Sequence, residues 1–321
     1  MEAMTPDRLK PAARDTFYFI GVTTAKSSIM KVFPRWAEYL KLGDVPIQGI
    51  DCQVHDKPEA YRKVVQFIKT DPKSLGGLVT THKLDLLAAA RDLFDELGPY
   101  AKRLGEISSI SKRDGRLWGH AKDPITSALS LQAFIPEGYW EESGAELCLL
   151  GAGGSSLALT MHLMDNVSPS KGPRKIVVTN RSTPRLESMK QIHAESNPGY
   201  GVEHHHCPTP ADNDRIVAQL ADGSVVANAT GLGKDAPGSP VTNAVEFPMN
   251  GYAWDFNYRG DLLFLEQARA AAREKNLTIE DGWVYFIHGW TRVIEEVFHI
   301  DIPAGGPVFD ELSRIASEAR K

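Results

Sequence analysis

The segment Glu146–Met164, with the sequence ELCLLGAGGSSLALTMHLM, decides the fold. Glu146–Leu150 is a short apolar run typical of a buried strand, and it leads directly into the glycine-rich turn Gly151–Ser156. A helical stretch, Leu157–Met164, follows. Strand, glycine-rich turn and helix in this order are typical of the first βα unit of a dinucleotide-binding domain. The third glycine of the usual pattern is replaced by Ser156, so the match is partial.

The residues of this turn suit a pyrophosphate. Gly151 permits the tight turn, and Gly153 and Gly154 let the backbone approach the anion at a helix N-terminus. There, free N–H groups and the helix dipole favour negative charge. We predict that Gly151, Gly153, Gly154 and Ser155 bind the cofactor. The alternative to a cofactor site is that these glycines are needed only for the shape of an αβ turn.

The end of the next strand, Lys175–Thr179, distinguishes between cofactors. An NAD site usually places Asp or Glu here for the ribose hydroxyls, but this chain continues as Asn180-Arg181-Ser182-Thr183-Pro184-Arg185. Guanidinium groups offer bidentate donors to phosphate oxygens. The sequence therefore favours NADP over NAD, with a solvated loop as the alternative. The predicted cofactor residues of this loop are Asn180, Arg181, Ser182 and Arg185.

Strands and helices alternate along the whole chain, which indicates the α/β class. Strands are predicted at Thr16–Val22, Ile47–Val54 and Gly77–Thr81, separated by helical patterns around 32–42 and 57–69. A second βα series runs from Glu146 to about Ala272, and two last helices, about 284–298 and 307–319, are expected to fold back on the first domain. We predict an N-terminal α/β domain with a mixed sheet (1–123, joined by 282–321) and a Rossmann-like, doubly wound NADP-binding domain (124–281).

Composition limits the classes of partner. The 321 residues carry a net charge of −5 and no long basic run, which argues against nucleic acid. No apolar run is long enough to span a bilayer, and the polar first 15 residues are expected to form a flexible arm rather than a secretion signal. The three cysteines have neither disulfide-framework nor metal-ligand spacing. We predict a cytoplasmic monomer or homodimer that acts on a small molecule.

Nine ordered segments resemble the shikimate/quinate dehydrogenase family over about residues 16–300. They are GVTTAKSS, GGLVTTHK, LGEISSI, DGRLWGHAKD, GAGGSS, TNRSTPR, NATGLG, DFNYRG and DGWVYFIHG. The resemblance implies a two-domain enzyme whose N-terminal domain binds substrate, with the active site in the cleft between the domains. It also implies a catalytic Lys–Asp pair, which falls on Lys83 and Asp123.

The chemistry of that pair fits alcohol oxidation, because a base must accept the hydroxyl proton while hydride leaves carbon. A free lysine titrates near ~10.4, so burial or a nearby charge would have to tune Lys83. Asp123 could hydrogen-bond the same hydroxyl. A structural salt bridge or a solvated lysine at a helix start is the alternative.

The family resemblance also assigns residues around the nicotinamide. It places Asn228, Thr230 and Gly282 along that ring, and it places Tyr258 toward the substrate. Each of these residues could instead have a purely structural role, as a turn residue or as a ring packed in the core.

The substrate-binding positions depart from the family pattern. The S-x-S-P loop becomes Lys26-Ser27-Ser28-Ile29, Asn-Val-Thr becomes Gly77-Leu78-Val79, and the glutamine of the last helix becomes Gly289 beside His288. A changed set of polar groups predicts a changed substrate. Lys26, Lys122 or Arg292 could bind an anion, and Trp118 or Trp290 could stack on a ring. The predicted substrate-binding residues are Ser27, Ser28, Thr81, Ser108, Tyr258 and His288.

The run His204-His205-His206-Cys207 contains metal-ligand types, but consecutive strand residues alternate between faces and cannot close on one ion. We predict no metal site. The sequence thus predicts an NADP-dependent oxidoreductase that interconverts a secondary alcohol and a ketone on a polyhydroxylated ring or hydroxy acid. A true shikimate or quinate dehydrogenase and a non-catalytic NADP(H)-binding sensor remain alternatives.

Overall fold

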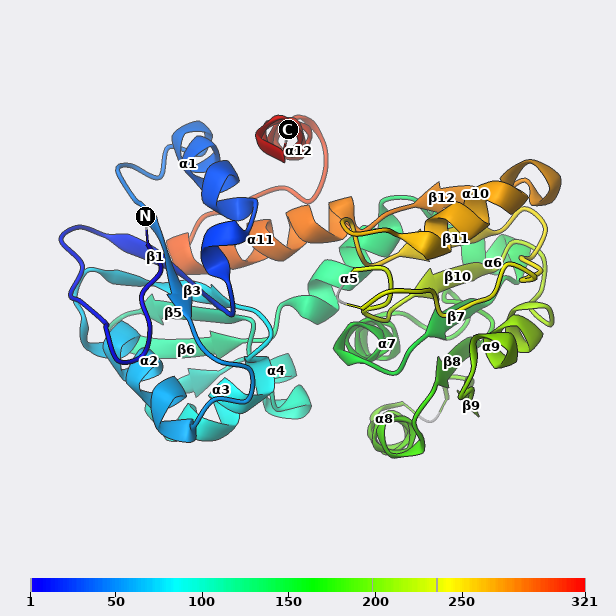
Figure 1. Cartoon of the computed structure of the whole chain (residues 1–321), viewed down its shortest axis with the longest axis horizontal. Helices are drawn as coiled ribbons and strands as arrows, with labels where there is room; N and C mark the ends of the chain where they lie inside the picture. Colours follow the sequence, from blue (N-terminus) through cyan, green and yellow to red (C-terminus); the bar gives the residue numbers. More distant parts are fainter. Residues whose placement is uncertain (1, 198, 235, 321) are drawn as a thin grey trace. The chain divides into compact units, whose positions relative to one another are not determined.

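The computed structural model describes residues 2–197, 199–234 and 236–320 (Figure 1). The chain divides into two compact units, which we call the first unit (Met1–Lys122 and Ile287–Lys321) and the second unit (Asp123–Phe286). Each unit contains its own six-stranded sheet, so the predicted α/β class with two sheets is confirmed.

The first unit contains a mixed sheet with the strand order β2-β1-β3-β5-β6-β4. Its strands are β1 (Thr16–Gly21), β2 (Ile47–Asp51), β3 (Ser74–Val79), β4 (Glu96–Leu97), β5 (Ser109–Arg113) and β6 (Arg116–His120). Its helices are α1 (Ile29–Tyr39), α2 (Pro58–Thr70), α3 (Lys83–Ala90), α4 (Pro99–Leu104) and α12 (Pro307–Arg320), with short 3₁₀ turns η1 (Thr24–Lys26) and η2 (Arg91–Leu93). Helix α11 (Trp283–Phe298) begins in the second unit and continues into the first.

β5 pairs antiparallel with both β3 and β6, and its pair with β6 is a tight hairpin. β5 and β6 are joined by Asp114-Gly115, which have φ values of +52° and +74°. Positive φ at both positions matches the twist of the flanking strands, and Asp-Gly is a preferred pair for such a turn.

The second unit is an all-parallel sheet with the order β12-β11-β10-β7-β8-β9. Its strands are β7 (Leu147–Leu150), β8 (Ile176–Asn180), β9 (Val202–His206), β10 (Val225–Asn228), β11 (Tyr252–Asp255) and β12 (Thr278–Glu280). Its helices are α5 (Asp123–Gln132), α6 (Tyr139–Ser143), α7 (Gly154–Asn166), α8 (Thr183–Ser196), α9 (Pro210–Val217) and α10 (Leu263–Lys275). Because the chain winds from β7 to β9 on one side and from β10 to β12 on the other, this is the doubly wound order of dinucleotide-binding domains, with its switch point between β7 and β10.

The N-terminal segment is docked, so the prediction of a flexible arm is wrong around Met4. The Met4 N–H donates to the Gly49 carbonyl (2.9 Å), and the Asp51 N–H donates to the Met4 carbonyl (2.8 Å). β2 is an edge strand, whose free backbone groups readily accept another extended segment.

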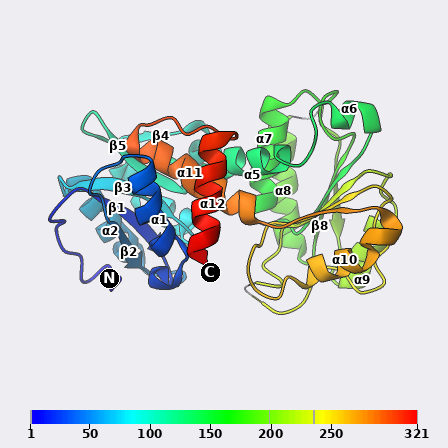
Figure 2. The ribbon, with the colours of Figure 1, turned by 90° about the horizontal axis from the view of Figure 1, so that it is seen from above.

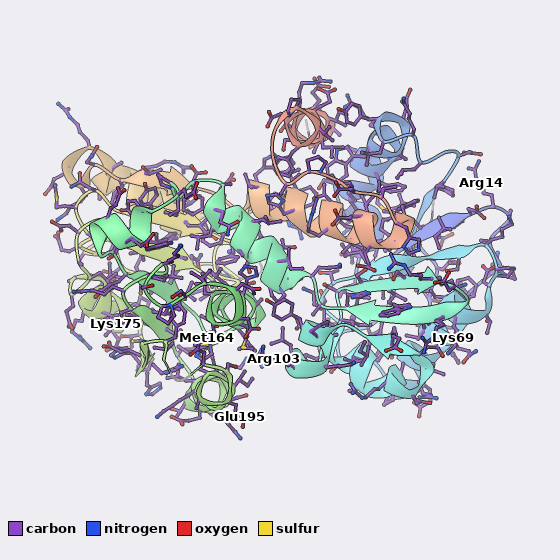
Figure 3. All side chains as sticks on the ribbon, turned by 180° about the vertical axis from the view of Figure 1, so that it is seen from behind. Arg14, Lys69, Arg103, Met164, Lys175 and Glu195 are labelled. Carbon is purple, nitrogen blue, oxygen red and sulfur yellow. The ribbon has the colours of Figure 1, made fainter. Side chains whose placement is uncertain are left out.

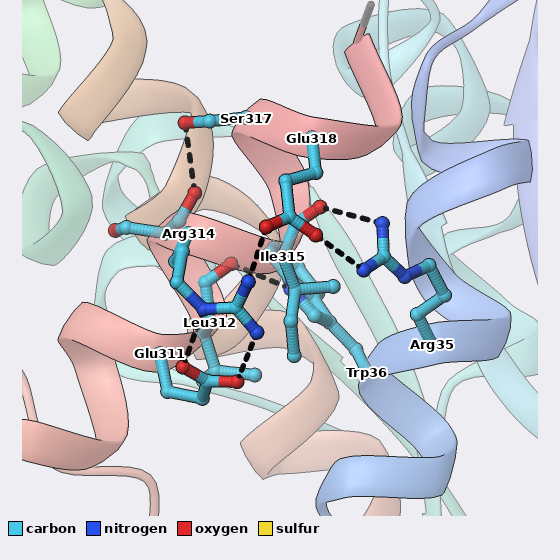
Figure 4. Close-up of polar contacts among 9 residues, drawn as sticks. Arg35, Trp36, Glu311, Leu312, Arg314, Ile315, Ser317 and Glu318 are labelled. Carbon is cyan, nitrogen blue, oxygen red and sulfur yellow. Dashed lines mark hydrogen bonds and ion pairs between the residues drawn. The ribbon is translucent and has the colours of Figure 1, made fainter.

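Helix α12 packs beside α1 within the first unit (Figure 2). The buried Trp36 indole Nε1 donates to the Leu312 carbonyl (2.8 Å), and Arg35 pairs with Glu318 (2.7 Å) on the surface (Figure 4). Arg314 extends this surface network to Glu311 and Glu318. The indole joins the C-terminal helix to the core, whereas the exposed ion pairs contribute little.

Elsewhere, charged side chains such as Arg14 and Glu195 are exposed, while Met164 is buried in the core of the second unit (Figure 3). Within the described residues, no helix is long and apolar enough to cross a membrane.

The α1–α12 contact gives a stability prediction. Trp36→Phe removes a buried donor and part of a fully buried ring, so it should lower the free energy of unfolding by about 2–3 kcal/mol. Arg35→Gln should cost no more than about 1 kcal/mol, because its ion pair is exposed. Urea denaturation followed by circular dichroism measures both. Equal losses in the two variants would contradict this account of how α12 is held.

Candidate functional site

The glycine-rich turn of the second unit lies at the carboxyl end of β7, where α7 begins at Gly154. Gly151 has φ +110°, and a Cβ at this position would lie 2.8 Å from Thr230 Cγ2, so only glycine fits. A Cβ on Gly154 would meet nothing within 4 Å, so a ligand can approach the backbone at this position. Among the described residues, no side chain caps the N-terminus of α7. The N–H groups of its first turn are therefore available to an anion.

Asn180 connects this turn to the loop after β8. Its Oδ1 accepts from the Ala152 N–H (3.2 Å), and its Nδ2 donates to the Ser182 carbonyl and hydroxyl (2.9 and 3.0 Å). The amide is thus already used within the protein, and its role here is to hold two loops in register. Arg181, Ser182 and Arg185 are exposed beside it, and no carboxylate follows β8 within this loop.

A buried polar network shapes the ends of β10 and β11. The fully buried Asn228 accepts from the Thr230 N–H and hydroxyl (3.0 and 2.6 Å) and donates to Asp255 (2.9 Å). Asp255 also accepts from the Asn257 N–H, and Asn257 Nδ2 donates to the Thr230 carbonyl. Burial raises the pKa of Asp255 to about 6. Sequence reasoning singled out Asn228 and Thr230 but missed Asp255 and Asn257, although both stand in the DFNYRG segment.

Gly282 and Tyr258 lie close to this network. A Cβ on Gly282 would collide with the Phe256 carbonyl, so glycine is required there for packing. The half-buried Tyr258 ring packs against Phe286 and Trp283, at centroid distances of 4.7 and 5.5 Å.

In the first unit, Lys83 is the half-buried first residue of α3 and follows an unusual turn. Thr81 is exposed and has φ +58°, which is rare for a β-branched residue. The His82 N–H donates back to the Thr80 carbonyl (2.5 Å), which makes a γ-turn centred on Thr81. Asp123 is the half-buried first residue of α5 and belongs to the second unit.

The loop after β1 carries the predicted serines. Thr24 is clamped by Asp51, whose Oδ1 accepts both the Thr24 N–H (2.9 Å) and its hydroxyl (2.5 Å). Ser27 and Ser28 follow and are half-buried, and the Ser28 hydroxyl has no hydrogen-bond partner among the described residues. Asp51 therefore fixes the start of this loop, a role that sequence reasoning missed.

Two groups proposed for substrate contact are bonded within the first unit. The Ser108 hydroxyl accepts from the Lys122 N–H (2.7 Å), and Lys122 Nζ pairs with Glu296 (2.6 Å). His120 Nε2 lies 3.1 Å from the same carboxylate. The hydrogen bonds from His120 and Lys122 hold the pKa of Glu296 well below its usual range. Lys122 is thus the partner of an internal carboxylate.

The residues near the end of the chain lie in the core. His288 is 1% exposed and stacks on Phe309 at 4.4 Å, and Trp290 packs edge-on against Phe17 and Phe19. Arg292 is likewise buried and donates to the Ile302 carbonyl. Burial lowers the pKa of His288 to about 4.

His204 of β9 pairs with a histidine of α8. His204 Nε2 lies 2.9 Å from His193 Nδ1, and His193 Nε2 lies 2.8 Å from the Thr160 hydroxyl. Burial and the neighbouring His204 lower the pKa of His193 to about 4. Within the described residues, no group of three potential ligands could hold a metal ion.

We next compared the sequence with known proteins. No family profile matches the chain. Shikimate dehydrogenase (NADP(+)) of Bacillus cereus strain AH820 is 30% identical over 133 residues, which cover 41% of this chain and 44% of that protein. The enzyme of the same name from Symbiobacterium thermophilum is 26% identical over 219 residues, covering 67% and 69%. The chain thus matches less than half the length of the Bacillus relatives.

Solved structures match over nearly the whole chain. Shikimate dehydrogenase from Aquifex aeolicus gives a TM-score of 0.72 at 19% identity and covers 98% of this chain and 100% of that one. The ligand-free 5-ketofructose reductase of Gluconobacter gives 0.66 at 17% identity, covering 96% and 99%. Fold and local sequence together define a two-domain, Rossmann-type protein. In local sequence and in fold, the chain is similar to shikimate dehydrogenases.

Because two histidines are buried, we expect the free energy of unfolding to fall in acid. The pKa of both His193 and His288 is about 4 in the folded state, against 6.5 for an ordinary histidine side chain. Between those values the unfolded state binds more protons, so stability is full above pH 6.5 and falls as the pH drops toward 4, by up to about 3 kcal/mol for each group. Urea denaturation at pH 7.5 and 5 should show the loss.

His288→Leu is the matched variant, because it fills the same space on Phe309 without a titrating group. It should reduce the pH-dependent loss of stability by up to half and leave stability at pH 7.5 nearly unchanged. An unaltered pH dependence would assign the effect to other groups.

Proposed function

We propose that this protein is an NADP-dependent oxidoreductase that interconverts a secondary alcohol and a ketone on a polyhydroxylated ring or a hydroxy acid. The observation that carries the proposal is the uncapped N-terminus of α7 behind an obligatory Gly151, with Arg181 and Arg185 exposed on the adjoining loop. Such a cradle fits a pyrophosphate, and the arginines fit a 2′-phosphate. The name shared by the sequence relatives, which specifies NADP(+), supports the same cofactor.

The residues that would hold NADP lie after four strands of the second unit, β7, β8, β10 and β12. They are Gly151, Gly153, Gly154 and Ser155 for the pyrophosphate, Arg181, Ser182 and Arg185 for the 2′-phosphate, and Thr230 and Gly282 along the nicotinamide. Asn180 and Asn228 act within these loops by holding their shape. Bound NADP would supply the hydride acceptor for the reaction.

Lys83 and Asp123 are proposed to handle the proton. Neutral Lys83 Nζ accepts the hydroxyl proton of the alcohol as the carbonyl forms, and it returns that proton in the reductive direction. The Asp123 carboxylate would orient this hydroxyl by accepting its hydrogen bond before the proton passes to Lys83. Ser27, Ser28, Thr81 and Tyr258 are the remaining candidates for substrate contact.

The side chains of the first unit favour a substrate other than shikimate. A Cβ at Gly77 would lie 2.7 Å from the Tyr18 carbonyl, and Val79 is fully buried, so neither position offers a polar group to a ligand. Ser108 is bonded to Lys122 and His288 lies in the core. A true shikimate or quinate dehydrogenase remains the second candidate, since the sequence relatives are named shikimate dehydrogenase. The same fold in a 5-ketofructose reductase agrees with the general rule that the fold alone does not select the substrate.

The setting proposed for the enzyme is the cytoplasm, as a monomer or homodimer. Its three cysteines are free and buried, which suits a reducing compartment.

The proton role of Lys83 gives a direct test. Lys83→Met should lower kcat by about 10²–10⁴-fold, because a positioned acid–base group is lost, while NADP affinity stays within about twofold. The assay follows absorbance at 340 nm with shikimate, quinate, cyclitols, sugar acids and the corresponding ketones. Lys63→Met on α2, whose side chain is exposed, is the control. NADPH binding without turnover on any substrate would favour a sensor over an enzyme.

The cofactor preference is tested on the loop after β8. Arg181→Gln should weaken NADP binding about 10–100-fold, the value of one or two charge-assisted hydrogen bonds, with little effect on NAD. Arg269→Gln on α10 is the control for a lost surface charge. Equal weakening of NAD and NADP would show that Arg181 does not read a 2′-phosphate.

A further inference from the structure

The turn that presents Lys83 is strained, and something must hold it. Thr81 sits at φ +58° in the γ-turn closed by the His82 N–H and the Thr80 carbonyl. A β-branched residue rarely adopts this conformation, which persists only where its surroundings fix it. On the N-terminal side, the Thr80 N–H is fixed by the Ile20 carbonyl of β1 (3.0 Å).

On the C-terminal side, the contact is made by a side chain from another helix. His82 is 1% exposed, and its Nδ1 lies 3.1 Å from the hydroxyl of Tyr61, which is also 1% exposed. Tyr61 belongs to α2, which packs beside α3 on the same side of the sheet (Figure 1). The two rings lie 5.5 Å apart. His82 is thus held directly before Lys83.

The Tyr61 hydroxyl is itself fixed by the loop after β2. It accepts from the Asp56 N–H (3.0 Å) and lies 3.2 Å from the Gln53 carbonyl. Its single proton goes either to Gln53 or to His82, and both arrangements leave the oxygen bonded to His82. One oxygen atom therefore ties the loop after β2 to the start of α3.

We propose that Tyr61 is a positioning residue for Lys83. Through His82, its hydroxyl holds the strained turn at Thr81 in the conformation that starts α3 at Lys83. The expected effect on turnover depends on the proposed function, whereas the effect on the Lys83 side chain does not.

Tyr61→Phe removes only the oxygen, and Tyr139→Phe is the matched control. Tyr139 is in the second unit, where its hydroxyl donates to the Gly223 carbonyl (2.6 Å). Each variant keeps its ring and loses one hydroxyl group, with its contacts to Asp56, Gln53 and His82 in Tyr61→Phe and its contact to Gly223 in Tyr139→Phe, so Tyr61→Phe should be the more destabilised of the two. A purely structural role for Tyr61 predicts the same functional result in both.

The first readout does not require activity. Reductive methylation with ¹³C-formaldehyde labels each lysine, and the Lys83 resonance is identified by its loss in Lys83→Arg. Tyr61→Phe should shift this resonance and change its titration, whereas Tyr139→Phe should leave both unchanged. A Lys83 signal that is the same in Tyr61→Phe and the parent protein would overturn the proposal.

The second readout is kinetic. Tyr61→Phe should lower kcat about tenfold or more with NADP affinity unchanged, and Tyr139→Phe should alter neither. In a Thr81→Gly background, where positive φ is not strained, the loss caused by Tyr61→Phe should be smaller. A shifted Lys83 resonance with full kcat would contradict the positioning role. If the parent protein turns over no substrate, the proposed function fails and the methyl resonance alone decides the Tyr61 contact.

Discussion

The backbone turn between β7 and α7 is the constraint on which the second unit depends. Gly151 adopts φ +110° with Thr230 packed against the place where a side chain would be. Because only glycine fits, the strand ends and the helix begins within a few residues, and the first N–H groups of α7 stay uncapped. The same point is where the winding of the sheet reverses between β7 and β10. The uncapped start of α7 therefore lies at the switch point of the sheet, which is where doubly wound domains bind their ligands.

Much of the fold follows from local sequence, because buried strands and amphipathic helices have distinct periods. The helix predicted at 57–69 is α2 (Pro58–Thr70), and those predicted at 284–298 and 307–319 are α11 (Trp283–Phe298) and α12 (Pro307–Arg320). Two predictions were wrong where residues distant in sequence determine the local structure. The pairing of Met4 with the edge of β2 has no local signal, and the strand predicted to reach Thr81 ends at Val79 because the chain turns left-handed there.

The candidate site shows a different limit of sequence reasoning. Residue types identify which side chains are polar, but not which of their hydrogen bonds are already made. Asn180 and Asn228 are bonded within the protein, and Lys122 is paired with Glu296 on α11, 174 residues away. A buried polar group must find a partner, so its role depends on residues brought across the sheet. Asp255 and Glu296 are the partners that no local pattern singled out.

The two turns of this chain that depend most on backbone conformation are stabilised in opposite ways. At Gly151 the residue itself makes positive φ free of strain, and Asn180 adds a hydrogen bond from the Ala152 N–H. At Thr81 the residue opposes the conformation, and the turn exists because β1 holds one side and the buried His82–Tyr61 contact holds the other. A turn held by tertiary contacts is formed only when α2 and the sheet have packed. The placement of Lys83 is therefore coupled to the packing of α2 on the sheet of the first unit.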